Sequence, residues 1–82
     1  MAALGRPTKR SVTIAGHETS ISLEPVFWAA LEAAASAETL PVNALIARID
    51  VERLDTPGGA PNLTSAIRQW LLLRGAPDRR GE

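Results

Sequence analysis

The side chains best suited to chemistry in this sequence are short hydroxyls and a few charges near the N-terminus. Glu18, Ser20 and Ser22 alternate with other residue types, and Lys9 and Arg10 precede them. The hydroxyls can donate and accept hydrogen bonds, and the two cations can attract phosphates or other anions. They do not form a nucleophilic site, because no base and no third orienting group accompany them. The pattern therefore indicates a binding surface.

The composition argues against other kinds of site. The 82 residues contain one histidine, His17, and no cysteine, so neither a disulfide nor a structural zinc site can be built. There is no glycine-rich phosphate loop and no carboxylate pair with a matched histidine, so we predict a protein that is not an enzyme and needs no cofactor. The apolar runs are too short to span a bilayer and no signal-peptide pattern occurs, so we expect a cytoplasmic protein without a membrane partner.

The chain length bounds the size of the fold. Residues 1–8 and 75–82 lack periodicity and are rich in Gly, Pro and charge, so we predict a disordered arm and a disordered tail. A domain at residues 9–74 remains, and about 65 residues bury only a marginal core unless chains associate. We therefore expect a homodimer. Because nine basic and nine acidic residues cancel, attraction of an anionic partner must come from a local cluster of cations.

The hydrophobic pattern of the N-terminal segment predicts a β-hairpin. Its apolar residues include Val12, Ile14, Ile21 and Leu23. The first two positions are even and the last two are odd, so one continuous strand would place them on opposite faces. A two-residue turn at Gly16-His17 brings them to one face and pairs Ala15 with Glu18, Ile14 with Thr19, and Val12 with Ile21. One long strand with a bulge at Gly16 is the alternative.

The hairpin prediction places strands at about residues 11–15 and 18–23. The face opposite the apolar one then carries Ser11, Thr13, Ala15, Glu18, Ser20 and Ser22.

Three helices are predicted after the hairpin, at about residues 25–38, 41–53 and 62–74. Prolines fit the start of the first two, and Asn62 caps the third. Trp28 flanks the apolar stripe of the first helix and is expected at its edge. The apolar face of the third helix (Leu63, Ile67, Trp70 and Leu71) is expected to pack on the dimer core or on the partner chain. The predicted fold class is mainly α with a short N-terminal β-segment.

This order of elements resembles the ribbon-helix-helix superfamily of Arc-type and MetJ-type bacterial repressors. The matching residues lie within positions 18–53 and include the segments Thr-Ser-Ile-Ser-Leu (19–23) and Leu-Pro-Val-Asn-Ala-Leu-Ile (40–46). The longer segment from Lys9 to Glu24, together with Trp28 and residues 62–67, is similar to an uncharacterised bacterial branch of this superfamily. The resemblance implies a homodimeric transcriptional regulator that binds DNA, here with an N-terminal hairpin and an additional C-terminal helix.

The resemblance also implies which residues contact DNA. In this family, strands from two chains pair antiparallel and the exposed face of the ribbon enters the major groove. The start of the second helix rests on a phosphate, which the unpaired amides and the helix dipole favour. A basic arm would add salt-dependent affinity. The expected DNA-binding residues are Lys9, Arg10, Glu18, Ser20, Ser22, Val42 and Asn43.

Two features favour an alternative function. The ribbon carries short serines and an acid instead of the long side chains that bind base edges in bidentate fashion. Paired hairpins would form a four-stranded sheet whose three spacings of about 4.8 Å span roughly 14 Å, whereas a major groove is about 12 Å wide. Either the first strand leaves the sheet on DNA, or the protein is an interaction module with a protein partner. An antitoxin is a third alternative, although the tail after Gly75 is short and polar for wrapping a toxin. Pairing of the first strand within the chain or across the dimer stays open.

Overall fold

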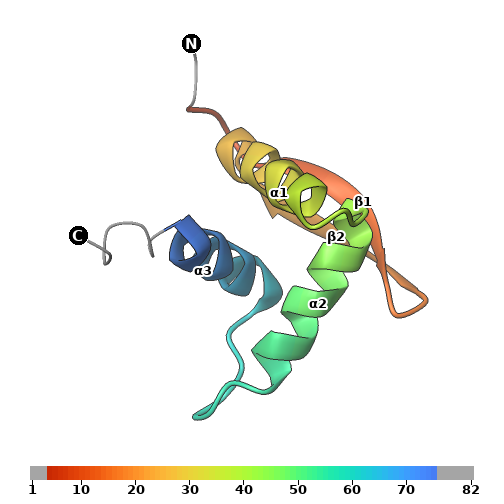
Figure 1. The fold of residues 1–82 in the computed structure, drawn as a ribbon, viewed down its shortest axis with the longest axis vertical. Coiled ribbons are helices and arrows are strands. Elements are labelled where there is room, and N and C mark those ends of the chain that lie inside the picture. The colour runs from red at the N-terminus through yellow and green to blue at the C-terminus, as the bar shows by residue number, and fades with distance from the viewer. Residues whose placement is uncertain (1–3, 76–82) are drawn as a thin grey trace.

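The computed structural model describes residues 4–75 and consists of two strands followed by three helices (Figure 1). The strands are β1 (Thr8–Ile14) and β2 (His17–Leu23), which form a two-stranded antiparallel sheet within one chain. The helices are α1 (Pro25–Ala37), α2 (Val42–Leu54) and α3 (Leu63–Gly75). This confirms the predicted mainly α architecture with an N-terminal hairpin and an additional C-terminal helix.

The turn of the hairpin lies one residue earlier than predicted. Ala15 and Gly16 are its central residues, with φ angles of 51° and 83°, and Ile14 faces His17 across them. Positive φ at both central positions defines a type I′ turn, in which glycine is preferred at the second position. The predicted turn at Gly16-His17 is therefore wrong. The predicted pairing with Ile21 is also wrong, because Val12 faces Thr19.

The corrected register nevertheless leaves the two faces of the hairpin as predicted. It differs from the expected register by two residues, and such a shift keeps every side chain on the same face. Val12, Ile21 and Leu23 are accordingly buried against the helices, with exposed fractions of 5%, 3% and 0%. The alternation of the sequence thus predicted the faces correctly, although the turn residues were misassigned.

The first strand begins earlier than expected. Thr8 is the first residue of β1, so the ordered domain reaches into the arm predicted at residues 1–8. Residues 1–3 of that arm lie outside the described part of the chain, as do residues 76–82 of the predicted tail. Gly75, which opens that tail in the prediction, ends α3 instead. Because β1 extends to Thr8, the basic residues Lys9 and Arg10 belong to a strand.

The turn supplies a first testable prediction. Ala15 has a φ of 51°, a conformation that costs an L-residue with a Cβ roughly 1–2 kcal/mol. Asparagine tolerates this conformation and is favoured before glycine in type I′ turns. Ala15→Asn should therefore raise the free energy of unfolding by about 0.5–1 kcal/mol, measured by urea denaturation. Ala15→Val should lower it, and equal stability of both variants would contradict the assigned turn.

The helix ends explain how the chain reverses after α1. Thr39 adopts a left-handed φ of 59°. The Leu40 N–H donates to the Ala35 carbonyl at 2.9 Å, and the Thr39 N–H donates to the Ser36 carbonyl at 3.0 Å. This is a Schellman motif, with threonine in the place that glycine usually takes. It ends α1 and directs the chain into α2.

The third helix begins with a side-chain cap. Asn62 Oδ1 accepts a hydrogen bond from the Ser65 N–H at 2.8 Å, which confirms the predicted capping role of Asn62. The three helices otherwise begin or end within one residue of their predicted bounds.

The hydrophobic core lies between the hairpin and the three helices. Residues without exposed surface come from β2 and all three helices: Leu23, Leu31, Leu45, Ile46 and Ile67. Since Ile67 is among them, the apolar face of α3 packs on the core of its own chain. Trp28 is also 2% exposed, so its expected place at the edge of the helical stripe is wrong. Its indole turns inward because β1 extends far enough for Nε1 to donate to the Thr8 carbonyl at 2.8 Å.

Ion pairs join the middle and the C-terminal end of α3 to the residues that flank the two ends of α1. Arg68 bonds to Glu24 at 2.9 Å, and Arg74 bonds to Glu38 at 3.0 Å. Glu38 also accepts a hydrogen bond from Arg48 at 3.1 Å, and the Arg48 and Arg74 guanidinium groups together hold the pKa of Glu38 below its usual range. Exposed pairs of this kind stabilise a fold only slightly. The apolar contacts of α3 with the core, which include those of the fully buried Ile67, therefore contribute more to its attachment than these ion pairs do.

Candidate nucleic-acid interface

The solvent face of the ribbon is polar along its whole length. The register places Lys9 opposite Ser22, Ser11 opposite Ser20, and Thr13 opposite Glu18, and directly opposed residues share a face. All six side chains are exposed. The structure thus brings together four of the residues expected to bind DNA, namely Lys9, Glu18, Ser20 and Ser22.

Two further residues of this face were not selected as DNA contacts from the sequence. Ser11 and Thr13 were predicted to lie on the same face as Ser20, but they were not counted among the binding residues. The alternation of Ser11 and Thr13 with the apolar Val12 was the sequence pattern from which they could have been selected as DNA contacts. The observed pairing adds their hydroxyls to the face and makes both strands contribute equally.

Arg10 does not belong to the solvent face of the ribbon. It pairs with Ile21, so its side chain leaves the strand on the side of the core. Its guanidinium lies 4.5 Å from the ring centroid of Trp28, and its Nη1 donates to Glu32 Oε2 at 2.8 Å. The adjacent cations Lys9 and Arg10 therefore act on opposite sides of β1, as the alternation of a strand requires.

The start of α2 contains Val42 and Asn43, the other residues that were expected to contact DNA. Pro41 occupies the N-cap position and makes no side-chain capping bond, while Asn43 is exposed and Val42 is partly buried. The Leu45 N–H donates to the Pro41 carbonyl at 3.1 Å, and the amides before it are those that a helix leaves without an intrahelical partner. These amides can hold an anion. They belong to a helix that packs against β1, and so they are separate from the solvent face of the ribbon.

The arginines of the described residues are mostly neutralised by neighbouring acids. Five of them form ion pairs: Arg10, Arg48, Arg53, Arg68 and Arg74. Within residues 4–75, Arg6 and Lys9 make no ion pair with another described residue. Both lie at the N-terminal side of β1. The positive charge most available to a phosphate is therefore concentrated beside the ribbon.

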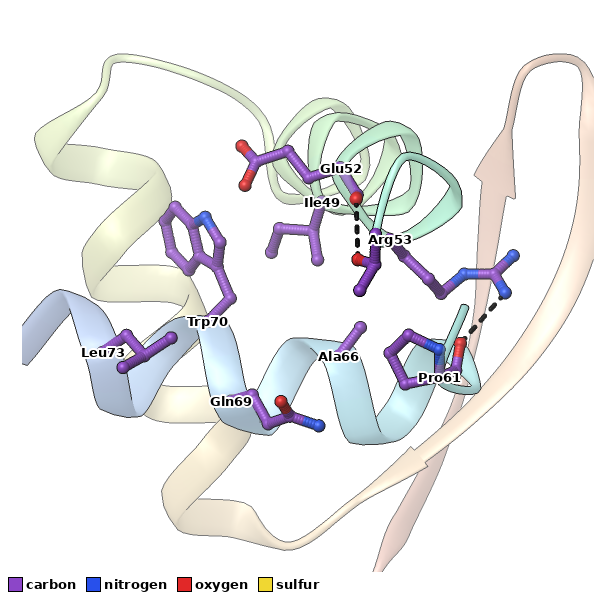
Figure 2. Close-up of a pocket in the computed structure, with 9 residues that line it drawn as sticks. Ile49, Glu52, Arg53, Pro61, Ala66, Gln69, Trp70 and Leu73 are labelled. Carbon is purple, nitrogen blue, oxygen red and sulfur yellow. Dashed lines mark hydrogen bonds between the residues drawn. The ribbon is translucent and has the colours of Figure 1, made fainter. Parts of the chain in front are cut away.

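A pocket lies between α2 and α3. Figure 2 shows this pocket of about 170 Å³, into which Ile49, Ala66 and Trp70 contribute apolar surface. Arg53 at its edge is already engaged, since it donates to Asp50 at 2.8 Å and to the Pro61 carbonyl at 3.1 Å. The pocket can accommodate an apolar group, but it presents no pair of groups suited to acid–base or nucleophilic chemistry.

The described part of the chain contains neither a metal-binding cluster nor a membrane-spanning helix. No group of three His, Asp or Glu side chains lies close enough together there to hold a metal ion. Among the described helices, none combines the length and the apolar character needed to cross a membrane.

Comparison with known proteins gives the class of protein that this fold represents. A family model described as "Ribbon-helix-helix domain" matches residues 7–74, so the chain belongs to the ribbon-helix-helix family. This confirms the resemblance seen in the sequence. Neither the comparison with curated proteins nor the comparison with solved structures gave a match. Ribbon-helix-helix domains are generally DNA-binding transcription regulators, and they typically form dimers.

Proposed function

We propose that this protein is a DNA-binding transcriptional regulator that acts as a homodimer and inserts its β-ribbon into the major groove. The observation that supports this most directly is the polar solvent face of the ribbon in a ribbon-helix-helix chain. Serine and threonine hydroxyls can bond to any base edge, and Glu18 can accept from the amino group of cytosine. Lys9 adds a phosphate contact, as do the amides near Val42 and Asn43.

The difficulty of a four-stranded sheet arises when the hairpins of two chains pair with each other, and it does not apply to the β1–β2 hairpin of a single chain. Two strands separated by about 4.8 Å form a ribbon that is narrow enough for a groove of about 12 Å. β1 is held by the bond from Trp28 to Thr8 and by the stacking of Arg10 on Trp28, so it does not need to leave the sheet. We therefore propose that the β1–β2 ribbon of a single chain occupies the groove.

The proposal gives Lys9 and Arg10 different contributions to phosphate binding. Lys9 lies on the solvent face and is expected to contact a phosphate directly. Arg10 can do so only after its guanidinium leaves Glu32, so its contribution is expected to be smaller.

An amide NMR titration with a short mixed-sequence DNA duplex, at low and at moderate salt, tests this proposal. We expect shifts at residues 8–22 and around Val42 and Asn43, and these shifts should weaken as salt rises. Lys9→Ala should flatten the dependence of log K on log salt by about 0.9 for each lost phosphate contact, or about 1.8 when both chains of the homodimer contact DNA. Absence of shifts at low salt, or shifts scattered over α1 and α3, would contradict the proposal.

The second candidate function is a protein-interaction module that no longer reads DNA. The neutral net charge and the ion pairing of five arginines favour it, since a DNA-binding domain usually presents an excess of positive charge. The same titration separates the two functions, because this module would leave the ribbon amides unchanged by DNA.

A further inference from the structure

The segment that precedes the ribbon has a composition suited to a narrow anionic site. Residues 5–7, which we call the Gly-Arg-Pro segment, stand directly before β1, and no acidic residue occurs before Glu18. Arg6 and Pro7 are exposed, and Arg6 makes no ion pair with another residue of the described range 4–75. Because no neighbouring carboxylate neutralises it, the Arg6 guanidinium can interact with an external anion.

The backbone of the Gly-Arg-Pro segment is held against α1. The ring of Pro7 fixes its own φ and disfavours the helical conformation at Arg6, so it favours extended backbone there. A Cβ at Gly5 would lie 3.3 Å from Pro25 Cγ, so Gly5 passes close to the start of α1 (Figure 1). On the other side of Pro7, the Thr8 carbonyl accepts a hydrogen bond from the buried indole of α1. Arg6 therefore lies between two contacts with α1 and is presented to solvent.

The Gly-Arg-Pro segment lies next to the polar solvent face of the ribbon. Arg6 is three residues from Lys9, which begins that face, and three residues of extended chain span up to about 10 Å. In duplex DNA, one phosphate backbone separates the major groove from the adjacent minor groove. A ribbon in the major groove, with Lys9 at the phosphates, therefore leaves Arg6 beside the minor groove.

The minor groove suits an extended segment that carries an arginine. It is about 6 Å wide, which is too narrow for a helix or a two-stranded ribbon. In A·T-rich DNA it is narrower still and its potential is more negative, so it attracts inserted arginine side chains. Short N-terminal arms of other classes of DNA-binding domain read the minor groove in this way. The amino group at guanine N2 projects into this groove and distinguishes G·C from A·T there.

We propose that the Gly-Arg-Pro segment inserts Arg6 into the minor groove beside the ribbon, and that this contact gives the protein a preference for A·T base pairs there. The inference rests on the proposed function, because it needs the ribbon in the adjacent major groove. It adds a second reading site to the ribbon, whose hydroxyls can bond to any base edge and therefore discriminate poorly between base pairs.

The first part of the test compares three labelled duplexes by fluorescence anisotropy at low salt. They share a central segment and carry A·T, G·C or inosine·C base pairs on both sides of it. Inosine lacks the N2 amino group of guanine and keeps the same major-groove edge, so only a minor-groove contact distinguishes the last two duplexes. The wild-type protein should bind the A·T and inosine·C duplexes about five- to tenfold more tightly than the G·C duplex. Equal affinity for the inosine·C and G·C duplexes would overturn the proposal.

The second part assigns the preference to a residue. Arg6→Ala should bind the three duplexes with equal affinity, because the side chain that enters the minor groove is gone. Lys9→Ala is the matched control, since it removes a nearby cation of the ribbon face and should weaken binding to all three duplexes by the same factor. Circular dichroism verifies that both variants are folded. A preference for inosine·C over G·C that persists in Arg6→Ala would overturn the proposal.

The same measurements distinguish failure of this inference from failure of the proposed function. If the wild-type protein bound all three duplexes equally, only the minor-groove contact of Arg6 would be overturned. If it bound none of them at low salt, the proposed DNA-binding function would be overturned together with the inference.

Discussion

Trp28→Ala is expected to remove a large part of the stability of this domain. Replacing a buried tryptophan by alanine typically costs about 3–5 kcal/mol, and folded domains are stable by only about 5–15 kcal/mol. Here the indole is 2% exposed and it connects α1 to β1 through its bond to the Thr8 carbonyl. The variant loses packing volume, that hydrogen bond and the surface on which Arg10 stacks. Chemical denaturation followed by circular dichroism measures the effect.

Two further substitutions locate the origin of this loss. Trp28→Phe retains much of the packing volume but leaves the Thr8 carbonyl without its donor, so a smaller loss of about 1–3 kcal/mol is expected. Trp70→Ala removes a partly buried indole from α3 and should cost less than Trp28→Ala. If Trp28→Ala cost no more than Trp70→Ala, the indole of Trp28 would not be the main connection between the hairpin and α1.

The second large effect is expected on DNA binding. The double variant Ser20→Glu with Ser22→Glu adds two carboxylates to the ribbon face of each chain, where they would meet bases and phosphates. At about 1–3 kcal/mol for each disrupted base contact, affinity should fall about 100-fold or more. Fluorescence anisotropy with a labelled duplex at low salt measures this loss, because low salt retains the electrostatic part of the binding.

A control with the same change of charge separates position from net charge. Ala29→Glu with Ala33→Glu adds two carboxylates to the exposed face of α1, away from the ribbon. This control should weaken binding only modestly through the long-range field. Equal losses in the two double variants would show that the ribbon is not the DNA-binding face. Both proteins should retain the circular dichroism spectrum of the wild type.

Local sequence patterns were sufficient to predict most of the secondary structure and part of the candidate site. Alternation predicted the faces of the hairpin, because a strand sends successive side chains to opposite sides whatever the turn. Prolines and Asn62 predicted the helix starts, because they act through the backbone of their own first turn. Ser20, Ser22 and Glu18 were therefore placed on the exposed face correctly.

The tertiary structure decided the features that depend on contacts between distant residues. The turn moved to Ala15-Gly16, because the strand register is set jointly by the turn conformation and by pairing along all seven residues of each strand. That register extended β1 to Thr8, which supplied a hydrogen-bond acceptor for Trp28 and drew its indole into the core. The extension of β1 over Lys9 and Arg10 also sends these two cations to opposite sides of the strand. The strand register and the bond from Trp28 to Thr8 leave no local pattern, because they join residues that are distant in the sequence.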